Sequence, residues 1–375
     1  MQPVAAGDNA DHVRCDEVAT VDETPPHNPP RRKRPTLAEL AQAAGVNKST
    51  ASRALRDDSV IASTTRERIQ RLARELEYEP NASARRLYSA RTDLIAFSAH
   101  APSRAVGDND PFVIELLHAV MDEAAANELD VFVCRPKPGT AELATYRRIV
   151  GGHHADGFIL MDVRPNDARL PYLCAQRFPH VLFGRSALVL DEANTYPYPW
   201  VEVDNRVGAR IGTEHLITLG HTRIAFLGCG DAFTFEVDRR KGYQDALKAA
   251  GIPSDPDLCT PAGATQDDGY RLTRDLLAAA HPPTAIFAVS DVLAVGAMRA
   301  LHDAGVTVGR EFPVMGFDGL GLGEYVEPQL TTIKQPIRQV GQLLVKLLVA
   351  AQQDKQPEHI FLPPELIVRS STIGG

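Results

Sequence analysis

A short stretch near residue 50 carries side chains that can form hydrogen bonds with nucleic-acid bases. Its apolar residues recur at helical spacing and share one face of a helix. The opposite face carries hydrogen-bond donors and no acids, namely Lys48, Ser49, Ser52 and Arg53. A helix that lies in the major groove of DNA needs such a face, because arginine can donate two hydrogen bonds to one guanine. We therefore predict a recognition helix that opens at Asn47, whose side chain can cap it.

A second group of polar side chains follows short apolar runs farther along the chain. Arg185 comes just after one such run, while Asp291 and Asp318 come after two others. Arg239 lies near the start of an expected helix. In parallel α/β sheets, ligands bind beyond the carboxyl ends of the strands. These four side chains are therefore candidates for holding a small ligand through its hydroxyl groups.

The elements around the recognition helix are those of a helix-turn-helix. Thr36 followed by Glu39 predicts a capping box, and apolar residues at helical spacing follow it. Gly45 stands where a tight turn must bend the chain, which suits a residue free to take a positive φ. A third helix is expected to open with a capping box formed by Thr64 and Glu67 and to stop before Pro80.

From residue 93 onward, short apolar runs alternate with helical patterns. This alternation predicts an α/β fold with parallel sheets covered on both faces, in two subdomains that face each other across a cleft. The expected strands are 94–97, 131–133, 157–160 and 181–183 in one sheet, and 224–227, 285–289 and 314–317 in another. The expected helices are 112–126, 206–219, 239–250, 269–280 and 291–304.

Charge is divided unevenly along the chain. Residues 31–91 carry a net charge of +7, whereas residues 92–375 carry −10. A basic head on an acidic body is typical of a nucleic-acid-binding domain joined to another domain. Residues 1–34, rich in Pro and acids, are interpreted as a disordered tail.

The remaining composition argues against several kinds of protein. No apolar run is long enough for a signal peptide or a membrane span, so we expect no membrane partner. The five cysteines show no paired spacing, which indicates neither a zinc site nor a disulfide framework and fits the cytoplasm. The chain lacks a P-loop, a dinucleotide-binding glycine pattern and a nucleophile elbow. We predict no catalytic residue, no cofactor and no metal site.

Several ordered motifs together resemble the LacI/GalR repressor family, over roughly residues 36–375. The motifs are residues 36–53, Thr65-Arg-Glu67, Asn81 with Ala84, Arg85 and Leu87, Asp204-Asn205, Leu219-Gly-His221, Arg239 with Gly242-Tyr243, Gly316-Phe-Asp318, residues 330–335 and Arg369-Ser370. The resemblance implies an N-terminal helix-turn-helix head, a hinge helix and a body of the periplasmic-binding-protein type. The boundaries we expect are 1–34 for the tail, 35–80 for the head, 81–92 for the hinge and 93–375 for the body.

The resemblance also implies which residues contact DNA. Lys48 and Ser49 would be the variable base readers, and Arg53 a more general one. Leu87 would wedge between the central base pairs of the operator and open the minor groove, with Ala84 small enough to enter it; the alternative for Leu87 is an ordinary linker leucine. The full set of expected DNA contacts is Thr36, Asn47, Lys48, Ser49, Thr50, Arg53, Asn81, Ala84, Arg85 and Leu87.

For the body, the resemblance implies an effector site at the strand ends. The expected contacts are Phe112, Val113, Arg185, Arg239, Asp291 and Asp318. Acidic and arginine side chains beside an aromatic ring suit a sugar or a sugar phosphate. Alternatives remain for three of them: Asp291 as a helix cap, Arg239 as a structural ion-pair member and Phe112 as a core residue.

These observations predict a transcriptional regulator, most simply a repressor. It would bind a palindromic double-stranded DNA operator as a homodimer, and a small effector in the cleft would release it. The alternatives are a periplasmic-type sugar-binding protein and an α/β enzyme. The first lacks the expected export signal, and neither accounts for the basic head.

Overall fold

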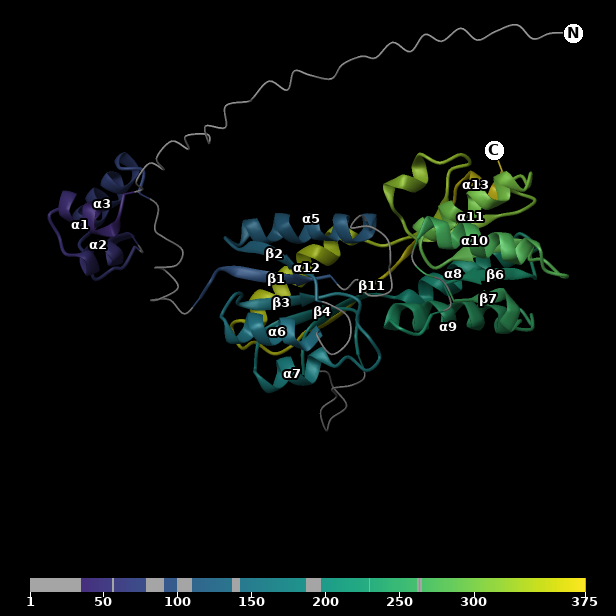
Figure 1. Cartoon of the computed structure of the whole chain (residues 1–375), viewed down its shortest axis with the longest axis horizontal. Coiled ribbons are helices and arrows are strands. Elements are labelled where there is room, and N and C mark those ends of the chain that lie inside the picture. Colours follow the sequence, from purple (N-terminus) through teal and green to yellow (C-terminus); the bar gives the residue numbers. More distant parts are fainter. Residues whose placement is uncertain are drawn as a thin grey trace, which may run out of the picture. The chain divides into compact units, whose positions relative to one another are not determined.

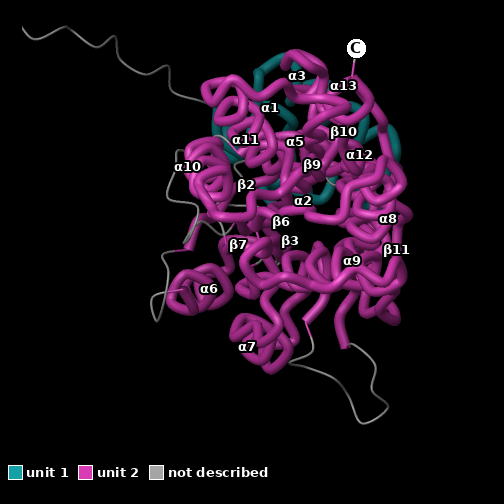
Figure 2. Tube along the Cα trace, turned by 90° about the vertical axis from the view of Figure 1, so that its right-hand side faces the viewer, with its two compact units in different colours: residues 1–81 teal, residues 82–375 magenta. Residues whose placement is uncertain are grey.

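The computed structural model describes residues 35–55, 57–78, 91–99, 110–136, 142–186, 197–228, 230–261, 263 and 265–374. The chain divides into two compact units, residues 1–81 and residues 82–375, called here the head and the body (Figure 2). The predicted tail and the predicted hinge residues Asn81, Ala84, Arg85 and Leu87 lie outside the described residues.

The described part of the head is built from α1 (Leu37–Ala43), α2 (Lys48–Leu55) and α3 (Ser63–Glu75). The predicted capping box at the start of α1 is confirmed, because Thr36 N donates to Glu39 Oε2 at 2.6 Å and Glu39 N donates to Thr36 Oγ1 at 3.3 Å. Gly45 takes the positive φ, 63°, that the turn after α1 requires. The core that joins the helices consists of Leu40, Ala44, Ala54, Ile69 and Ala73.

The capping box expected for the third helix is wrong. Helix α3 begins at Ser63, so Thr64 lies inside its first turn and cannot be the cap, which needs non-helical backbone. Ala62 takes the cap position and makes no side-chain cap hydrogen bond.

The first subdomain of the body is a six-stranded parallel sheet between two layers of helices. Its strand order is β11-β5-β4-β3-β1-β2. In Figure 1, α5 and α12 cover one face of the sheet, and α6 and α7 cover the other. The elements are β1 (Leu94–Ser98), α5 (Pro111–Ala126), β2 (Asp130–Cys134), α6 (Glu142–Gly151), β3 (Gly157–Leu160), α7 (Arg169–Ala175), β4 (His180–Phe183), β5 (Trp200–Val203), α12 (Ile337–Ala351) and β11 (His359–Leu362).

The second subdomain repeats this plan, with strand order β12-β10-β9-β8-β6-β7. Its pairings are parallel except for β10 with β12. The elements are α8 (Asn205–Thr218), β6 (Ile224–Leu227), α9 (Thr234–Ala249), β7 (Cys259–Thr260), α10 (Gln266–Leu277), β8 (Ala285–Ala288), α11 (Asp291–Asp303), β9 (Val314–Asp318), β10 (Thr331–Lys334), β12 (Glu365–Ile367) and α13 (Ser370–Ile373). Helices α8 and α9 pack so closely that a Cβ on Gly242 would lie 2.1 Å from Arg206 O.

The described chain crosses between the two subdomains at residues 203–205, 334–337 and 362–365. As a result α12 and β11 return to the first subdomain, and Figure 1 shows α12, in yellow, among the blue and teal elements of that subdomain. The predicted two-sheet α/β fold is confirmed, but this exchange of segments was not predicted. The crossings bring residues from three distant parts of the chain to the junction.

Candidate functional site

The head presents the predicted donors of α2 on its surface. Lys48, Ser49 and Arg53 are exposed. Asn47 caps the helix, since Thr50 N and Ser49 Oγ both donate to Asn47 Oδ1 at 2.7 Å. The inward face of α2 is buried against α1 and α3, so the outward donors are held on a fixed support.

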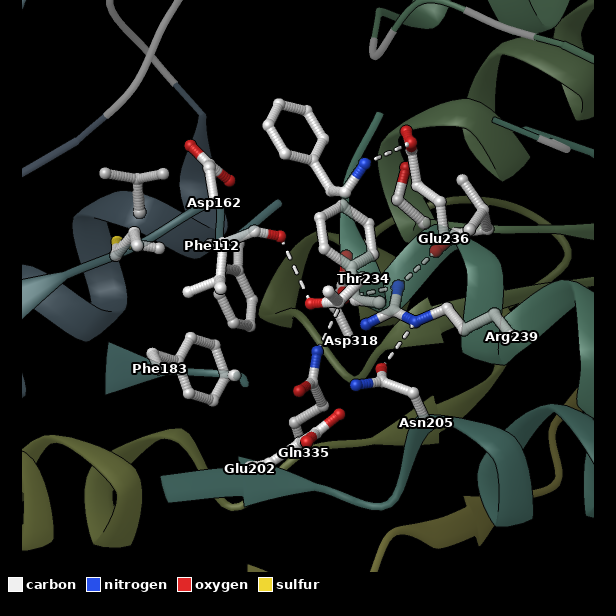
Figure 3. A pocket seen from close by; sticks show the side chains of 18 of the residues that line it. Phe112, Asp162, Phe183, Glu202, Asn205, Thr234, Glu236, Arg239, Asp318 and Gln335 are labelled. Atoms are coloured by element: carbon white, nitrogen blue, oxygen red, sulfur yellow. Dashed lines mark hydrogen bonds and ion pairs between the residues drawn. The ribbon is translucent and has the colours of Figure 1, made fainter. Parts of the chain in front are cut away.

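A cleft lies between the two subdomains of the body and encloses about 910 Å³ of space, including its open side (Figure 3). The first subdomain contributes Phe112, Val113, Met161, Asp162, Val163, Phe183, Gly184 and Glu202 to the lining. The second contributes Asn205, Phe233, Thr234, Phe235, Glu236, Arg239, Gly263, Val289, Ser290, Leu293 and Asp318, and Gln335 lies at a crossing.

Asp318, at the end of β9, is held in the cleft by an unfavourable backbone conformation. Its φ is 126°, outside the range that L residues usually adopt. Gln335 Nε2 donates to Asp318 Oδ1 at 2.8 Å, and Arg239 Nη1 lies 3.5 Å from the same oxygen. Such strain, retained by surrounding contacts, is common where a side chain must point at a ligand.

Arg239, in the second turn of α9, is buried and firmly held. Its guanidinium lies 3.5 Å from the ring centre of Phe317 and 5.0 Å from that of Phe235. Nε donates to Asn205 Oδ1 at 2.8 Å, and Nη1 donates to Val289 O. Figure 3 shows Arg239, Asn205 and Asp318 side by side in the wall of the cleft. The guanidinium therefore organises this wall.

Glu202, on β5, is a buried carboxyl group in the lining. Burial raises its pKa to about 7, although the adjacent Arg185 acts in the opposite direction. Arg185 Nε donates to Glu202 Oε2 at 2.5 Å, while Arg185 Nη2 donates to Asp238 Oδ2 at 3.1 Å. Because Asp238 lies on α9, Arg185 joins the first subdomain to the second.

Aromatic rings line the cleft from both subdomains. Phe112 and Phe183 stack with ring centres 5.9 Å apart, and Figure 3 shows both at the side formed by the first subdomain. Phe233 and Phe235, at the start of α9, stack at 5.7 Å. Flat apolar faces beside carboxylates can hold the C–H face of a ring and bond its hydroxyl groups.

The structure brings four of the six predicted effector contacts to the cleft: Phe112, Val113, Arg239 and Asp318. Phe112 also packs against the core of its subdomain. Arg185 is not in the lining, because its guanidinium lies against Glu202 and Asp238 instead.

Asp291 does not line the cleft either. Its carboxylate is fully buried and accepts hydrogen bonds from Leu320 N at 2.7 Å and Thr332 Oγ1 at 2.6 Å. Burial raises the pKa of Asp291, and the neighbouring Asp318 carboxylate raises it further. The alternative role as a helix cap is wrong, because Ser290 caps α11 by accepting from Leu293 N. Asp291 instead connects the loop after β9 to β10.

Several lining residues were not predicted. Helix α9 begins at Thr234 rather than near residue 239, so the aromatic and acidic residues of its first turn, Phe235 and Glu236, were overlooked. Asn205 and Gln335 lie at crossings between the subdomains, and Glu202 lies next to one. The motif Asp204-Asn205 starts α8, with Asp204 as its cap, and was the signal that could have identified the first of these crossings.

Two further features lie outside the cleft. Trp200 is a packing residue, stacked on His359 at 5.2 Å and in edge contact with Phe361 at 4.9 Å. Cys259 is disulfide-bonded, so the expectation of unpaired cysteines is wrong for that residue, whereas Cys134 and Cys174 are free. Among the described residues, no helix combines the length and apolar character needed to span a membrane.

Comparison with known proteins finds two family matches. Residues 36–81 match the bacterial regulatory proteins of the lacI family, and residues 213–372 match the periplasmic binding protein-like domain. The HTH-type transcriptional regulator CelR of Thermobifida fusca is 32% identical over 343 residues, which cover 91% of this chain and 99% of the relative.

Two solved structures are similar over most of the chain. The transcriptional regulator CelR–cellobiose complex has a TM-score of 0.68 at 30% identity and covers 90% of this chain and 100% of the other. The lac repressor dimer bound to operator and the anti-inducer ONPF has a TM-score of 0.77 at 26% identity and covers 91% of this chain and 100% of the other.

Proposed function

Because the chain belongs to the LacI family of transcriptional regulators, we propose that its cleft binds a carbohydrate whose presence weakens operator binding. Like its relatives, the chain is a DNA-binding transcriptional regulator with a helix-turn-helix and is not an enzyme. The finer points below are our proposal: the identity of the effector, the direction of its effect, the dimer, the hinge and the cytoplasmic location.

The observation that carries the carbohydrate proposal is the lining of the cleft. Carboxyl groups from both subdomains, Glu202 and Asp318 among them, line the same cleft as the stacked rings of Phe112 and Phe183. Carboxylate oxygens accept hydrogen bonds from hydroxyl groups, and aromatic faces pack against the C–H face of a sugar ring. One similar structure is the complex of CelR with cellobiose, which supports the same class of ligand here.

For DNA binding we propose a homodimer on a palindromic operator. Lys48, Ser49 and Arg53 would read bases in the major groove, and basic residues of the head would contact phosphates. Thr36, Asn47 and Thr50 would support these contacts. Residues 81–92 would form the hinge between a head of residues 35–80 and a body of residues 93–375, after a tail of residues 1–34.

The hinge residues would complete the operator contact. Asn81, Ala84 and Arg85 would lie along the minor groove, and Leu87 would separate the central base pairs. An isolated helix of this length is unstable in water, so its folding would depend on DNA and on a partner hinge. That dependence makes the segment a natural point of control.

Control would come from movement of the two subdomains. A ligand that touches both sides of the cleft favours one relative orientation, since its contacts exist only there. A coupling of about 1–3 kcal/mol between cleft and head would change operator affinity roughly 5- to 150-fold. We propose that the sugar-bound orientation is the one that separates the hinge segments.

The test is to capture genomic fragments with the purified protein, and to sequence them without a ligand, with a pool of neutral and phosphorylated sugars, and with purines. We expect one palindrome to be enriched and to be lost when a sugar is added. Arg53→Ala should lose roughly 10-fold or more in affinity for that palindrome, as removal of a guanine contact worth about 1–3 kcal/mol would predict. Sugar binding by this variant should be unchanged.

Two outcomes would contradict the proposal. Enrichment that persists with every sugar, but is lost with a purine, would overturn the carbohydrate assignment. Equal operator affinity in Arg53→Ala and the unmodified protein would overturn the proposed reading by α2.

A further inference from the structure

The described lining of the cleft contains more carboxyl groups than cationic side chains. Four carboxyl groups belong to it, those of Asp162, Glu202, Glu236 and Asp318. Within the described lining, Arg239 is the single cationic side chain. The carboxyl groups come from both subdomains, so a ligand in the cleft meets negative charge on either side.

The guanidinium of Arg239 is committed to the protein. It donates to Asn205 and to Val289 O, it lies near Asp318, and its plane stacks on the ring of Phe317. Its side chain is only 5% exposed. An arginine that binds a phosphate or a carboxylate presents its planar fork to the ligand with two parallel hydrogen bonds. Arg239 instead directs these N–H groups toward other residues of the cleft wall, Asn205 and Val289.

A further cation beside the cleft, Arg185, is also held between acids. Its two ends pair with Glu202 and Asp238, at 2.5 and 3.1 Å. Asp238 receives a second cation, Lys241 Nζ, at 3.8 Å. Arg185 therefore offsets the charges of Glu202 and Asp238, and the excess of negative charge in the described lining rests on Asp162, Glu236 and Asp318.

A different chemistry is available to a neutral ligand. The carboxylates of Asp318 and Asp162 lie toward the space between the subdomains in Figure 3, and carboxylates accept hydrogen bonds from hydroxyl groups. Like charges brought together in a partly desolvated site repel strongly, because screening there is weak. A hydroxyl group placed against one of these carboxylates would gain a charge-assisted hydrogen bond. A phosphate or carboxylate group would be repelled there, and the lining cation Arg239 already bonds to Asn205 and Val289 O.

We infer that the cleft selects an uncharged, polyhydroxylated ligand and excludes anionic ones, such as sugar phosphates and uronic acids. This inference rests on the proposed function and narrows its carbohydrate to the neutral class. The same charge pattern also gives the acids of the lining a role in specificity, in addition to holding hydroxyl groups.

The test is isothermal titration calorimetry of the full chain with neutral mono- and disaccharides, among them glucose, galactose, maltose and cellobiose. Each sugar that binds is then compared with its own phosphate monoester and with its uronic acid. We expect the anionic forms to bind at least about 100-fold more weakly, equivalent to about 2.7 kcal/mol. The difference should shrink only modestly as salt is raised, because salt screens partly buried charges less than exposed ones.

Two variants separate electrostatic selection from a general loss of shape. Asp162→Asn and Glu236→Gln each remove one negative charge and retain nearly the same volume, so each should reduce the discrimination against the phosphate several-fold. Glu214→Gln is the control, because Glu214 is on α8, pairs with Arg210 and is not part of the lining. That variant should keep the discrimination of the unmodified protein.

The outcomes distinguish this inference from the function on which it rests. A phosphate ester or uronic acid that binds as tightly as its neutral parent would overturn the inference and leave a carbohydrate regulator in place. Discrimination that stays constant in both cleft variants would also overturn it. No binding by any sugar, neutral or anionic, would overturn the proposed function itself.

Discussion

The head and the cleft both use arginine, but in opposite ways. The side chain of Arg53 on α2 is 54% exposed, and its nearest carboxylate oxygen, on Asp58, is 4.0 Å away. That of Arg239 in the cleft wall is 5% exposed and bonds to three protein groups. An exposed ion pair at such a distance contributes little, so Arg53 can exchange it for DNA. The buried and paired guanidinium of Arg239 instead fixes the shape of the cleft wall.

The difference extends to how each region is stabilised. The head has one small core cluster in its described part, with Leu40 and Ile69 as its largest fully buried members. Each sheet of the body is covered on both faces by helices. A small domain has little stability to lose, whereas a large one can carry buried charges and strained residues such as Asp318. The comparison predicts that the head and the body will unfold independently of each other.

The largest effect is expected from Leu40→Ala. Loss of a fully buried leucine costs about 2–5 kcal/mol, which is comparable to the whole stability of a small helical domain. The head should unfold and operator binding should disappear, while sugar binding by the body remains. Circular dichroism melting, together with calorimetry, would show this. Val60→Ala is the control, since Val60 is 74% exposed, and a melting profile equal to that of Leu40→Ala would contradict the comparison.

A smaller effect is expected from pH, because the titration of Glu202 should change the free energy of unfolding by on the order of 3 kcal/mol. Its pKa of about 7 in the folded protein lies above the ordinary value of 4.5, so the folded state favours the protonated form. This contribution to stability is complete below about pH 4.5 and is lost as pH rises through 7. Glu202→Gln should lack that loss.

Urea unfolding at pH 5 and at pH 8 measures this directly, because the other acids contribute equally to both proteins. The unmodified protein should lose more unfolding free energy than Glu202→Gln over this interval, at up to about 1.4 kcal/mol for each pKa unit of the shift. If the unfolding free energies of the two proteins fall equally between pH 5 and pH 8, Glu202 titrates at an ordinary pKa. The head, whose charges are exposed, should show no comparable step.

The sequence predicted the head more completely than the cleft, for a physical reason. A helix-turn-helix is specified by local signals, so Thr36, Gly45 and Asn47 could be assigned from their neighbours along the chain. The contacts that DNA would make with Lys48 and Arg53 need only an exposed helix face. The described structure adds little to that prediction beyond the start of α3.

The cleft depends on contacts between residues far apart in the chain. The prediction based on strand ends was correct for Asp318, which lies at the cleft, because parallel strands present their carboxyl ends together. They also suggested Asp291 and Arg185, whose side chains turn to Thr332 and Glu202 instead. Nothing in local spacing indicates that β5, β10 and β11 each lead into the other subdomain. Glu202 and Gln335 were overlooked for that reason.

The smallest effect concerns the ion pair that connects the two sides of the cleft. Asp238→Asn removes the partner of Arg185 on the second subdomain but leaves Glu202 in place. Arg185 is partly exposed, at 36%, so the pair is worth at most about 1 kcal/mol. Sugar affinity should fall about two- to five-fold, because the sugar must then stabilise this relative orientation of the subdomains without that ion pair.

Fluorescence of Trp200 offers the readout, as Trp200 is the only tryptophan in the chain and contacts Phe361, on whose ring the guanidinium of Arg185 lies at 5.1 Å. Asp245→Asn is the matched control. It breaks an ion pair with Arg206 that joins α8 to α9 within one subdomain, so sugar affinity should be unchanged. If both variants weaken sugar binding equally, the loss comes from altered α9 and not from the connection across the cleft. If only Asp238→Asn does so, a single arginine outside the lining helps to set the orientation that the ligand selects.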